Sequence, residues 1–166
     1  MVKLRTVLVA AVIATAGIIV FLVYYFSDQA VIKRRFQHLA EQLAKESPEN
    51  NLLSAAKGKH IGDMFADTCR VYLPGYDVDQ TFTGRDVQPY VMMARSRYKS
   101  IAVEFYDFNI TIPHEGLALV DVTAFVRAVT ASGETMREIH ELAFTLEKTE
   151  TGWQFTDIES VTVLER

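Results

Sequence analysis

The sequence predicts an α+β domain preceded by a membrane-spanning helix, and three observations carry this prediction. The 21 residues from Thr6 to Phe26 include no charged side chain. Between residues 27 and 98, apolar side chains recur every three to four residues, which is typical of helices. After Lys99, four long β-rich segments follow one another with short turns between them. Helices that precede strands, in place of alternating with them, indicate an α+β architecture.

The uncharged segment is long enough to cross a bilayer. As a helix it would extend about 31 Å, against a hydrocarbon layer of about 30 Å. Twelve of its residues are Leu, Ile, Val or Phe, which favours insertion by about 4 to 7 kcal/mol. The alternative is a cleaved secretory signal, whose apolar region is shorter, about 7 to 15 residues. We therefore expect residues 1–27 to be a short tail and an uncleaved membrane anchor, and residues 28–166 to be one domain.

Charge predicts the orientation and excludes one class of partner. Basic residues flank the anchor on both sides, with Lys3 and Arg5 before it and residues 33–35 after it. The short amino-terminal tail has no acidic residue, so we expect it in the cytoplasm and the domain on the other side, which is the periplasm in a Gram-negative bacterium. Beyond residue 27 there are 15 of the 17 basic and all 21 acidic residues. This acidic balance argues against nucleic acid as a partner.

Three helices and a hairpin are expected before the long strands. The first helix runs from Ser27 to Pro48, and the second from about 51 to 65. Pro74-Gly75 marks a turn between two short strands. Asp86 is the expected cap of the third helix. The expected buried side chains are Ile32, Phe36, Leu39 and Leu43 in the first helix, Leu53, Ala56, Ile61 and Met64 in the second, and Val87, Tyr90, Val91, Ala94 and Tyr98 in the third.

The remaining strands are expected at residues 100–112, 117–130, 134–148 and 153–164, joined by turns that contain glycine. Consecutive strands with tight turns pair antiparallel.

Two short motifs make a resemblance specific. "TFTGRDV" (Thr81 to Val87) leads from the hairpin into a helix, and "TGWQF" (Thr151 to Phe155) opens the last strand. With this order of elements, residues 28–163 resemble the nuclear transport factor 2-like superfamily of cystatin-like fold, including its polyketide-cyclase-like and ketosteroid-isomerase-like branches. The resemblance implies a strongly curved antiparallel sheet wrapped around about three helices as a cone. It also implies a small-molecule pocket at the wide end and an outer sheet face that dimerises.

Polar residues on apolar strand faces are the candidate site. Glu138 and His140 alternate with Met136 and with the apolar residues that follow, so we expect both to face the cavity. Trp153 and Phe155 likewise place Asp157 and Glu159 on an inward face. A histidine beside carboxylates in an apolar cup suits general acid–base chemistry. Relatives often have a histidine in the closing strand, where this chain has the two acidic residues.

The expected ligand-binding residues are Tyr72, Asp107, Glu138, His140 and Trp153, and the expected catalytic residues, if the protein is an enzyme, are His140, Asp157 and Glu159. Each has an alternative as a solvated rim residue or a core aromatic. Asp107 would share the face of Phe105 unless a β-bulge reversed it. Four scattered histidines and one cysteine have no metal-binding spacing, so no metal and no cofactor is expected.

The sequence leaves three functions open. We expect a non-catalytic protein that binds a small apolar ligand or supports a membrane-associated assembly, as a homodimer or with a membrane-protein partner. The alternative is an isomerase, dehydratase or cyclase, which requires His140 to face open volume within hydrogen-bond reach of a carboxylate. A lipid-binding module would need a large apolar tunnel.

Overall fold

The computed structural model describes residues 13–18, 22, 26–46 and 49–161. The chain divides into two compact units, residues 1–34 and residues 35–166. Much of the expected anchor, residues 6–26, lies outside the described residues. Within the described ranges, no helix has both the length and the apolar character needed to cross a membrane. The anchor therefore stays a prediction.

The three expected helices are confirmed as α2 (Asp28–Leu43), α3 (Asn51–Gly62) and α4 (Gly84–Ser96). Asn50 caps α3, because its side chain accepts a hydrogen bond of 2.7 Å from the backbone of Leu53. The expected cap of α4 is wrong by three residues. Thr83 is the cap, and the Asp86 carboxylate reaches back to accept its backbone N–H at 3.0 Å and its hydroxyl at 2.7 Å. This reciprocal arrangement is a capping box.

The expected buried side of α3 is only partly correct. Ile61 and Met64 are buried, but Leu53 and Ala56 are exposed. The reason is that glycines, and not an apolar stripe, bring α3 and α4 together. A Cβ atom on Gly62 would lie 2.5 Å from the carbonyl oxygen of Gly84. The helices therefore approach most closely at this end of α3. In its first half Ser54 still contacts Met92 and Arg95 of α4, while Leu53 and Ala56 face solvent.

The expected buried side of α4 is also only partly correct. Val87 is buried, but Tyr90 is 50% exposed, and Tyr98 lies at the start of β3 (Tyr98–His114) and not in the helix.

Six strands form one sheet in the order β2-β1-β6-β5-β4-β3. Their bounds are β1 (Phe65–Leu73), β2 (Val78–Phe82), β3 (Tyr98–His114), β4 (Leu117–Thr130), β5 (Thr135–Thr149) and β6 (Gly152–Ser160). A single 3-10 turn, η1 (Pro74–Tyr76), joins β1 to β2. The expected β3–β6 meander is confirmed, but the sheet is not wholly antiparallel, because β1 pairs parallel with β6. These two strands are distant in sequence, so no hairpin fixes their direction.

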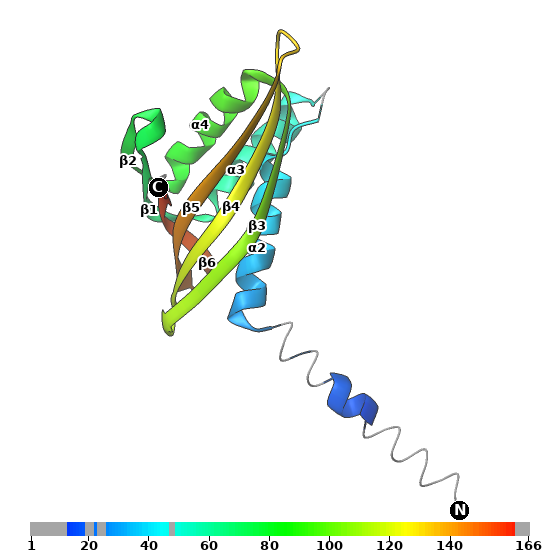
Figure 1. Ribbon diagram of the computed structural model, residues 1–166, viewed down its shortest axis with the longest axis vertical. Helices are drawn as coiled ribbons and strands as arrows, with labels where there is room; N and C mark the ends of the chain where they lie inside the picture. Colours follow the sequence, from blue (N-terminus) through cyan, green and yellow to red (C-terminus); the bar gives the residue numbers. More distant parts are fainter. Residues whose placement is uncertain (1–12, 19–21, 23–25, 47–48, 162–166) are drawn as a thin grey trace, which may run out of the picture. The chain divides into compact units, whose positions relative to one another are not determined.

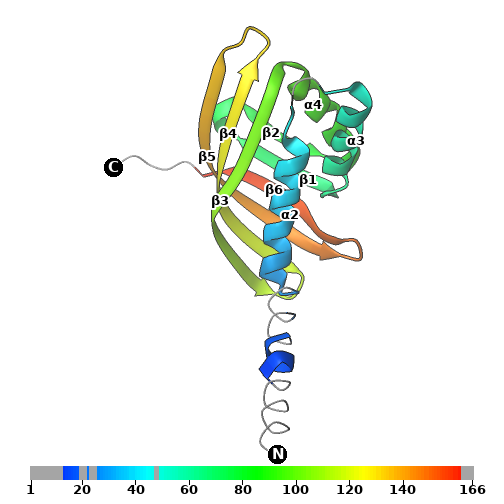
Figure 2. The same ribbon diagram turned by 90° about the vertical axis from the view of Figure 1, so that its right-hand side faces the viewer.

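The sheet is curved, and the helices lie on its concave side. In Figure 2 the strands bend around the side on which α3 and α4 lie, and Figure 1 shows the long β3, β4 and β5 from another direction. Phe36 of α2 is fully buried at the centre of the core. It meets the rings of Phe105, Phe108, Phe144 and Phe155 edge-on, with ring centroids 4.9 to 5.3 Å apart. Such edge-to-face pairs add to the stability gained from burial.

Candidate functional site

An apolar pocket of about 540 Å³ lies on the concave side of the sheet. Side chains from α2, α4, β3, β4 and β5 line it, and most of them are aliphatic or phenyl groups such as Leu39, Val91, Phe105 and Leu142. The polar lining residues are Tyr76, Arg95, Tyr98, His140 and Ser160. An apolar cavity of this size with a few polar groups is typical of small-molecule sites.

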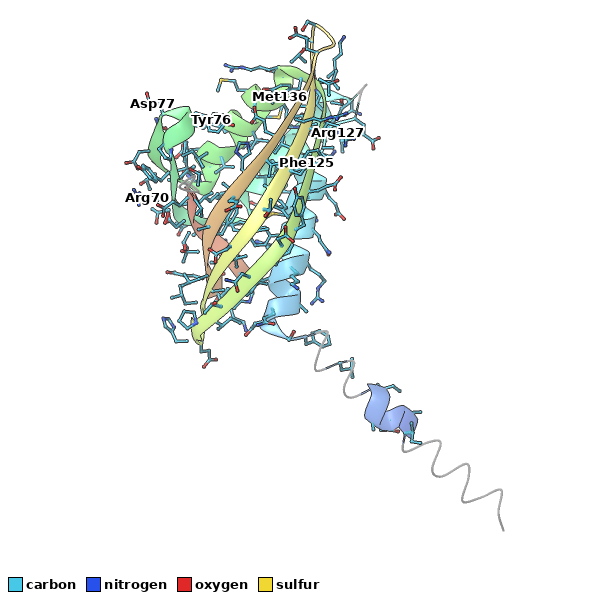
Figure 3. The ribbon with its side chains drawn as sticks, in the orientation of Figure 1. Arg70, Tyr76, Asp77, Phe125, Arg127 and Met136 are labelled. Carbon is cyan, nitrogen blue, oxygen red and sulfur yellow. The ribbon has the colours of Figure 1, made fainter. Side chains whose placement is uncertain are left out.

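Two polar residues of the pocket wall, Tyr76 and His140, contact a third polar residue, Glu138. The Tyr76 hydroxyl donates a hydrogen bond of 2.6 Å to Glu138 Oε2, and His140 Nε2 lies 2.9 Å from the same oxygen. The Tyr76 oxygen is also 3.2 Å from His140 Nε2. Figure 3 labels Tyr76, on the turn between β1 and β2, and Met136 of β5, the strand that also carries Glu138 and His140. We call Tyr76, Glu138 and His140 the polar cluster. His140 thus lines the pocket beside a carboxylate, whereas Glu138, which was also expected to face the cavity and bind a ligand, is absent from the pocket wall.

The cluster fixes the proton positions. A carboxylate accepts only, so Nε2 of His140 carries a hydrogen that points to Glu138. Nδ1 has no hydrogen-bond partner among the described residues, which leaves it free to accept a proton or a hydrogen bond. The hydrogen bond to Glu138, with burial and the Glu138 charge, raises the pKa of Tyr76 to about 12. Hydrogen bonds from Tyr76 and His140 lower the pKa of Glu138, against a smaller opposing effect of burial.

The expected inward positions of Asp157 and Glu159 are wrong. Leu146 pairs with Phe155, but Thr145 pairs with Asp157, so β6 contains a bulge at Thr156. Beyond this extra residue the alternation of faces is reversed. Ile158 and Ser160 now line the apolar pocket, while Asp157 and Glu159 are absent from its wall.

Asp107 is misplaced for a similar reason. A bulge in β3 falls between Tyr106 and Asn109, and Asp107 has a positive φ of 56°. Phe108 therefore takes the inward position against Phe36, and Asp107 is exposed.

Two expected aromatic ligand residues also lie away from the pocket. Tyr72 pairs with Glu159, on the face opposite to that of Ile158, and its ring lies 5.2 Å from the Arg70 guanidinium. Trp153 is 2% exposed and packs in the core. Neither residue lines the apolar pocket.

Two important residues escaped the sequence interpretation. Tyr76 lies in a turn, where alternation says nothing about direction, and its only signal is an aromatic residue directly after Pro74-Gly75. Arg95 lies in α4 and is 2% exposed. Its guanidinium donates to the carbonyl oxygens of Gln42, Leu43 and Ala44 at the end of α2, at 2.7 to 3.2 Å.

Glu49 completes the charge balance around Arg95. Its carboxylate pairs with the Arg95 guanidinium and lies 3.0 Å from Lys57 Nζ. Burial acts to raise the pKa of Glu49, but these two cations outweigh it and hold the pKa below its usual value. The group holds the end of α2 against α4, and the Arg95 guanidinium is bonded to protein groups.

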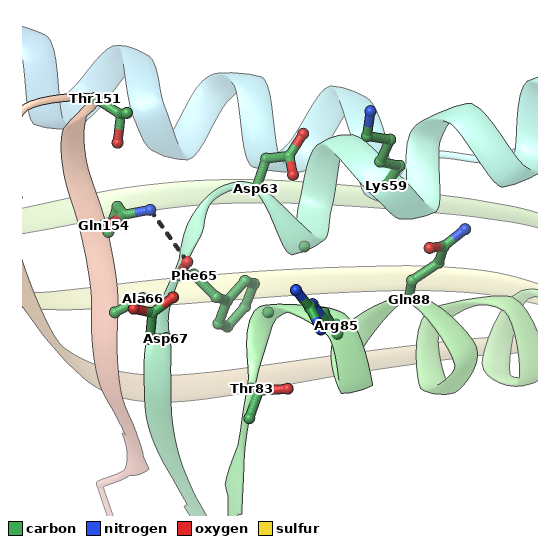
Figure 4. Close-up of a pocket in the computed structure, with 12 residues that line it drawn as sticks. Lys59, Asp63, Phe65, Ala66, Asp67, Thr83, Arg85, Gln88, Thr151 and Gln154 are labelled. Carbon is green, nitrogen blue, oxygen red and sulfur yellow. Dashed lines mark hydrogen bonds between the residues drawn. The ribbon is translucent and has the colours of Figure 1, made fainter.

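A second cleft of about 900 Å³ lies where α3, α4, β1 and the β5–β6 hairpin meet. Figure 4 shows Lys59 and Arg85 with Asp63 and Asp67 around it, and a hydrogen bond of 3.2 Å from Gln154 to the carbonyl oxygen of Phe65. Opposite charges alternate around this cleft, and they do not converge on one point. The polar cluster at the apolar pocket is therefore the better candidate site.

Comparisons with known proteins show the fold. Neither a protein-family model nor a curated protein matches the sequence. Solved structures do match. One is a protein of the nuclear transport factor 2-like family from Streptomyces avermitilis, named a candidate dehydratase (12% identity, TM-score 0.65, 84% of this chain and 99% of that chain). Another is a candidate aromatic ring hydroxylase from Novosphingobium aromaticivorans (14% identity, TM-score 0.67, 83% and 90%).

A third similar structure is the association domain of the C. elegans calcium/calmodulin-dependent protein kinase II (12% identity, TM-score 0.60, 84% and 99%). A domain of unknown function from Nostoc punctiforme is described as having a cystatin-like fold (14% identity, TM-score 0.60, 84% and 80%). At these identities the likeness concerns the fold alone. The α+β chain described above therefore has the nuclear transport factor 2-like, or cystatin-like, fold.

Proposed function

We propose that the domain binds a small, mainly apolar molecule in the apolar pocket. The observation that carries this proposal is the pocket itself, about 540 Å³ lined mostly by apolar side chains, with the polar cluster at one place on its wall. The apolar walls would desolvate the body of a ligand, and the cluster would select one polar group. The polar groups of Arg95 are already bonded to protein, so His140 and Tyr76 supply the contacts.

The membrane anchor is part of this proposal. Residues 6–26 would hold the domain at a bilayer, outside the cytoplasm, where apolar molecules concentrate. Tethering increases the effective concentration of a binding domain near its ligand or partner. In this view the protein is a non-catalytic binding or assembly component, with a homodimer or a membrane-protein partner formed through the outer sheet face.

Binding can be tested with the uncharged apolar fluorophore diphenylhexatriene, which brightens in apolar surroundings. We expect residues 28–166 to bind it at one site, and Ala94→Phe, which adds a ring at the pocket wall, to weaken binding at least tenfold. Ser96→Phe adds the same ring to α4 away from the pocket and should leave binding unchanged. Absence of binding by the unchanged domain contradicts the proposal.

A second candidate function is acid–base catalysis, and the geometry of His140 favours it. The imidazole faces open volume, Glu138 orients it through Nε2, and Nδ1 is available to take a proton from a ligand. The test is exchange of the acidic C–H protons of a small cyclic enone into deuterated water. Catalysed exchange that His140→Gln abolishes, while diphenylhexatriene binding persists, indicates an enzyme; exchange equal to that in buffer indicates a binding protein.

A further inference from the structure

The curved sheet has a notch beside the polar cluster. Strand β6 ends at Ser160, opposite Leu142, and the last bond of this pairing runs from the Val161 N–H to the Glu141 carbonyl oxygen at 2.8 Å. Beyond this point β5 continues to Thr135 with β4 on one side. On its other side, no strand in the described part of the chain pairs with it. Tyr76 of η1 crosses this gap through its contacts with Glu138 and His140.

A third and smaller cavity, of about 350 Å³, lies at the notch. Its wall consists of Pro74, Gly75, Tyr76, Ile139, His140, Glu141, Ser160 and Val161. Three of these, Tyr76, His140 and Ser160, also line the apolar pocket. Two cavities that share three wall residues are neighbours. Tyr76, which is 56% exposed, therefore stands between the apolar pocket and the cavity at the notch.

The backbone of Ile139, which no strand in the described residues pairs with on this side, presents polar groups to this cavity. The Glu141 carbonyl points to the β6 side, because Val161 bonds to it there. Backbone groups two residues apart on a regular strand point the same way, and the register of β5 with β4 is unbroken here. The N–H and C=O of Ile139 thus point into the notch, and no described strand satisfies them. Ile139 is 65% exposed, so this is an open sheet edge, to which a partner can add through backbone hydrogen bonds.

We propose that the notch is a binding subsite for the polar end of an elongated amphiphile. The apolar body of the ligand lies in the large pocket, and an amide-like end group pairs with the N–H and C=O of Ile139. Tyr76 is the gate between the two, since its ring must move for a ligand to occupy both cavities. This inference rests on the proposed ligand binding, and it adds the chemical class of the ligand.

The test compares decanamide with methyl decanoate, which has a similar chain and a carbonyl but no N–H. The full chain in lipid nanodiscs carries isotope-labelled isoleucine, so that Ile139 reports on the notch and Ile158 on the pocket. We expect both compounds to shift the Ile158 amide signal, and decanamide to do so at about fivefold lower concentration, which corresponds to one additional hydrogen bond. The Ile139 amide proton should in addition move downfield, because a ligand carbonyl bound at the notch accepts its hydrogen bond, and the Ile158 amide proton should not.

The outcomes separate the two proposals. If neither compound shifts Ile158, the proposed ligand binding fails. If both shift Ile158 equally and Ile139 does not respond, the pocket binds ligands but the notch is not a subsite.

Two variant pairs test the parts of the notch. Ile139→Pro removes the N–H that faces the gap, a substitution that edge strands tolerate, and should weaken both compounds about fivefold while diphenylhexatriene still binds. Arg137→Pro removes the next N–H on the same edge, away from both cavities, and should weaken the binding of neither compound.

Tyr76→Phe releases the gate and should speed association and dissociation together, several-fold, whereas Tyr90→Phe on α4 should change neither rate. A change in dissociation alone would assign Tyr76 to a fixed wall.

Discussion

Glu138 accepts hydrogen bonds from two different side chains, and this double contact sets the proton distribution at the pocket. Because its carboxylate stays charged, Tyr76 is held neutral and His140 is held with its Nε2 hydrogen turned away from the ligand. Both residues on β5 could be predicted from alternation, since the β4–β5 register has no bulge. Tyr76 could not, because a turn residue has no periodic neighbours. The sequence therefore predicted two members of the polar cluster and missed the third.

The raised pKa of Tyr76 gives a direct prediction at this scale. Ionising Tyr76 would place a phenolate beside the Glu138 carboxylate, so the pKa of about 12 should fall towards 10 in Glu138→Gln. The measurement is the carbon chemical shift of the Tyr76 ring against pH, with Tyr76→Phe to assign the signal. An equal pKa in both proteins would show that the carboxylate does not control the phenol.

Removal of the Arg95 side chain should lower the stability of the fold strongly. Arg95→Ala leaves Glu49 buried with Lys57 alone and removes the donors from three carbonyl groups of the α2 end. We expect a loss of about 3 to 5 kcal/mol in the free energy of unfolding. Trp153 is the one tryptophan and is buried, so its fluorescence reports urea unfolding. Arg97→Ala, an exposed neighbour, should change stability by less than about 0.5 kcal/mol.

Glu49 predicts a pH dependence of stability. Its pKa is lower in the folded state, so its contribution is complete above the unfolded value of about 4.5 and is lost as pH falls through the lower folded value. Glu49→Gln should be less stable than the unchanged protein at pH 7, and the difference should shrink with acidification below pH 4.5. A difference that grows in acid would reverse the assigned sign.

At the scale of elements, two glycines decide how α3 and α4 meet. The sequence pattern predicted that both helices exist, because apolar spacing and capping residues are local signals. It did not predict their buried sides, because the contact is made by backbone at Gly62 and Gly84, and glycine carries no hydropathy signal. The bulge at Thr156 was missed for a related reason, and the bulge at Asp107 was foreseen only as an alternative. One inserted residue reverses every later side chain, and local composition does not mark its position.

Gly62→Ala should therefore separate the helices. Its Cβ would lie 2.5 Å from the Gly84 carbonyl oxygen, and backbone cannot move aside as a side-chain end can. We expect a destabilisation of at least about 2 kcal/mol, measured as a lower midpoint of thermal unfolding. Gly75→Ala, where no atom lies within 4 Å of the new Cβ, is the matched control and should leave the midpoint nearly unchanged.

At the scale of the whole molecule, the proposed anchor would distinguish two modes of action. A free binding protein would sample the whole compartment, whereas a tethered one would act only at the membrane surface. The uncharged run from residue 6 to 26 predicts the second.

The anchor prediction is tested by fractionation of membranes. The full chain should stay in the pellet after a high-pH carbonate wash, and residues 28–166 should appear in the supernatant. Replacing Gly17 and Ile18 by Arg adds two charges at the centre of the segment and should release the full chain, at a cost of about 5 kcal/mol or more for insertion. Retention of this variant in the pellet would assign membrane attachment to another part of the protein.

The parallel pairing of β1 with β6 has a consequence for biosynthesis. Phe65 and Phe155 are register partners although 90 positions separate them, so this seam of the sheet cannot close until the final strand has left the ribosome. Contacts of such long range also slow folding. The apolar concave side of the sheet therefore stays open to solvent for most of translation, until the final strand has been synthesised.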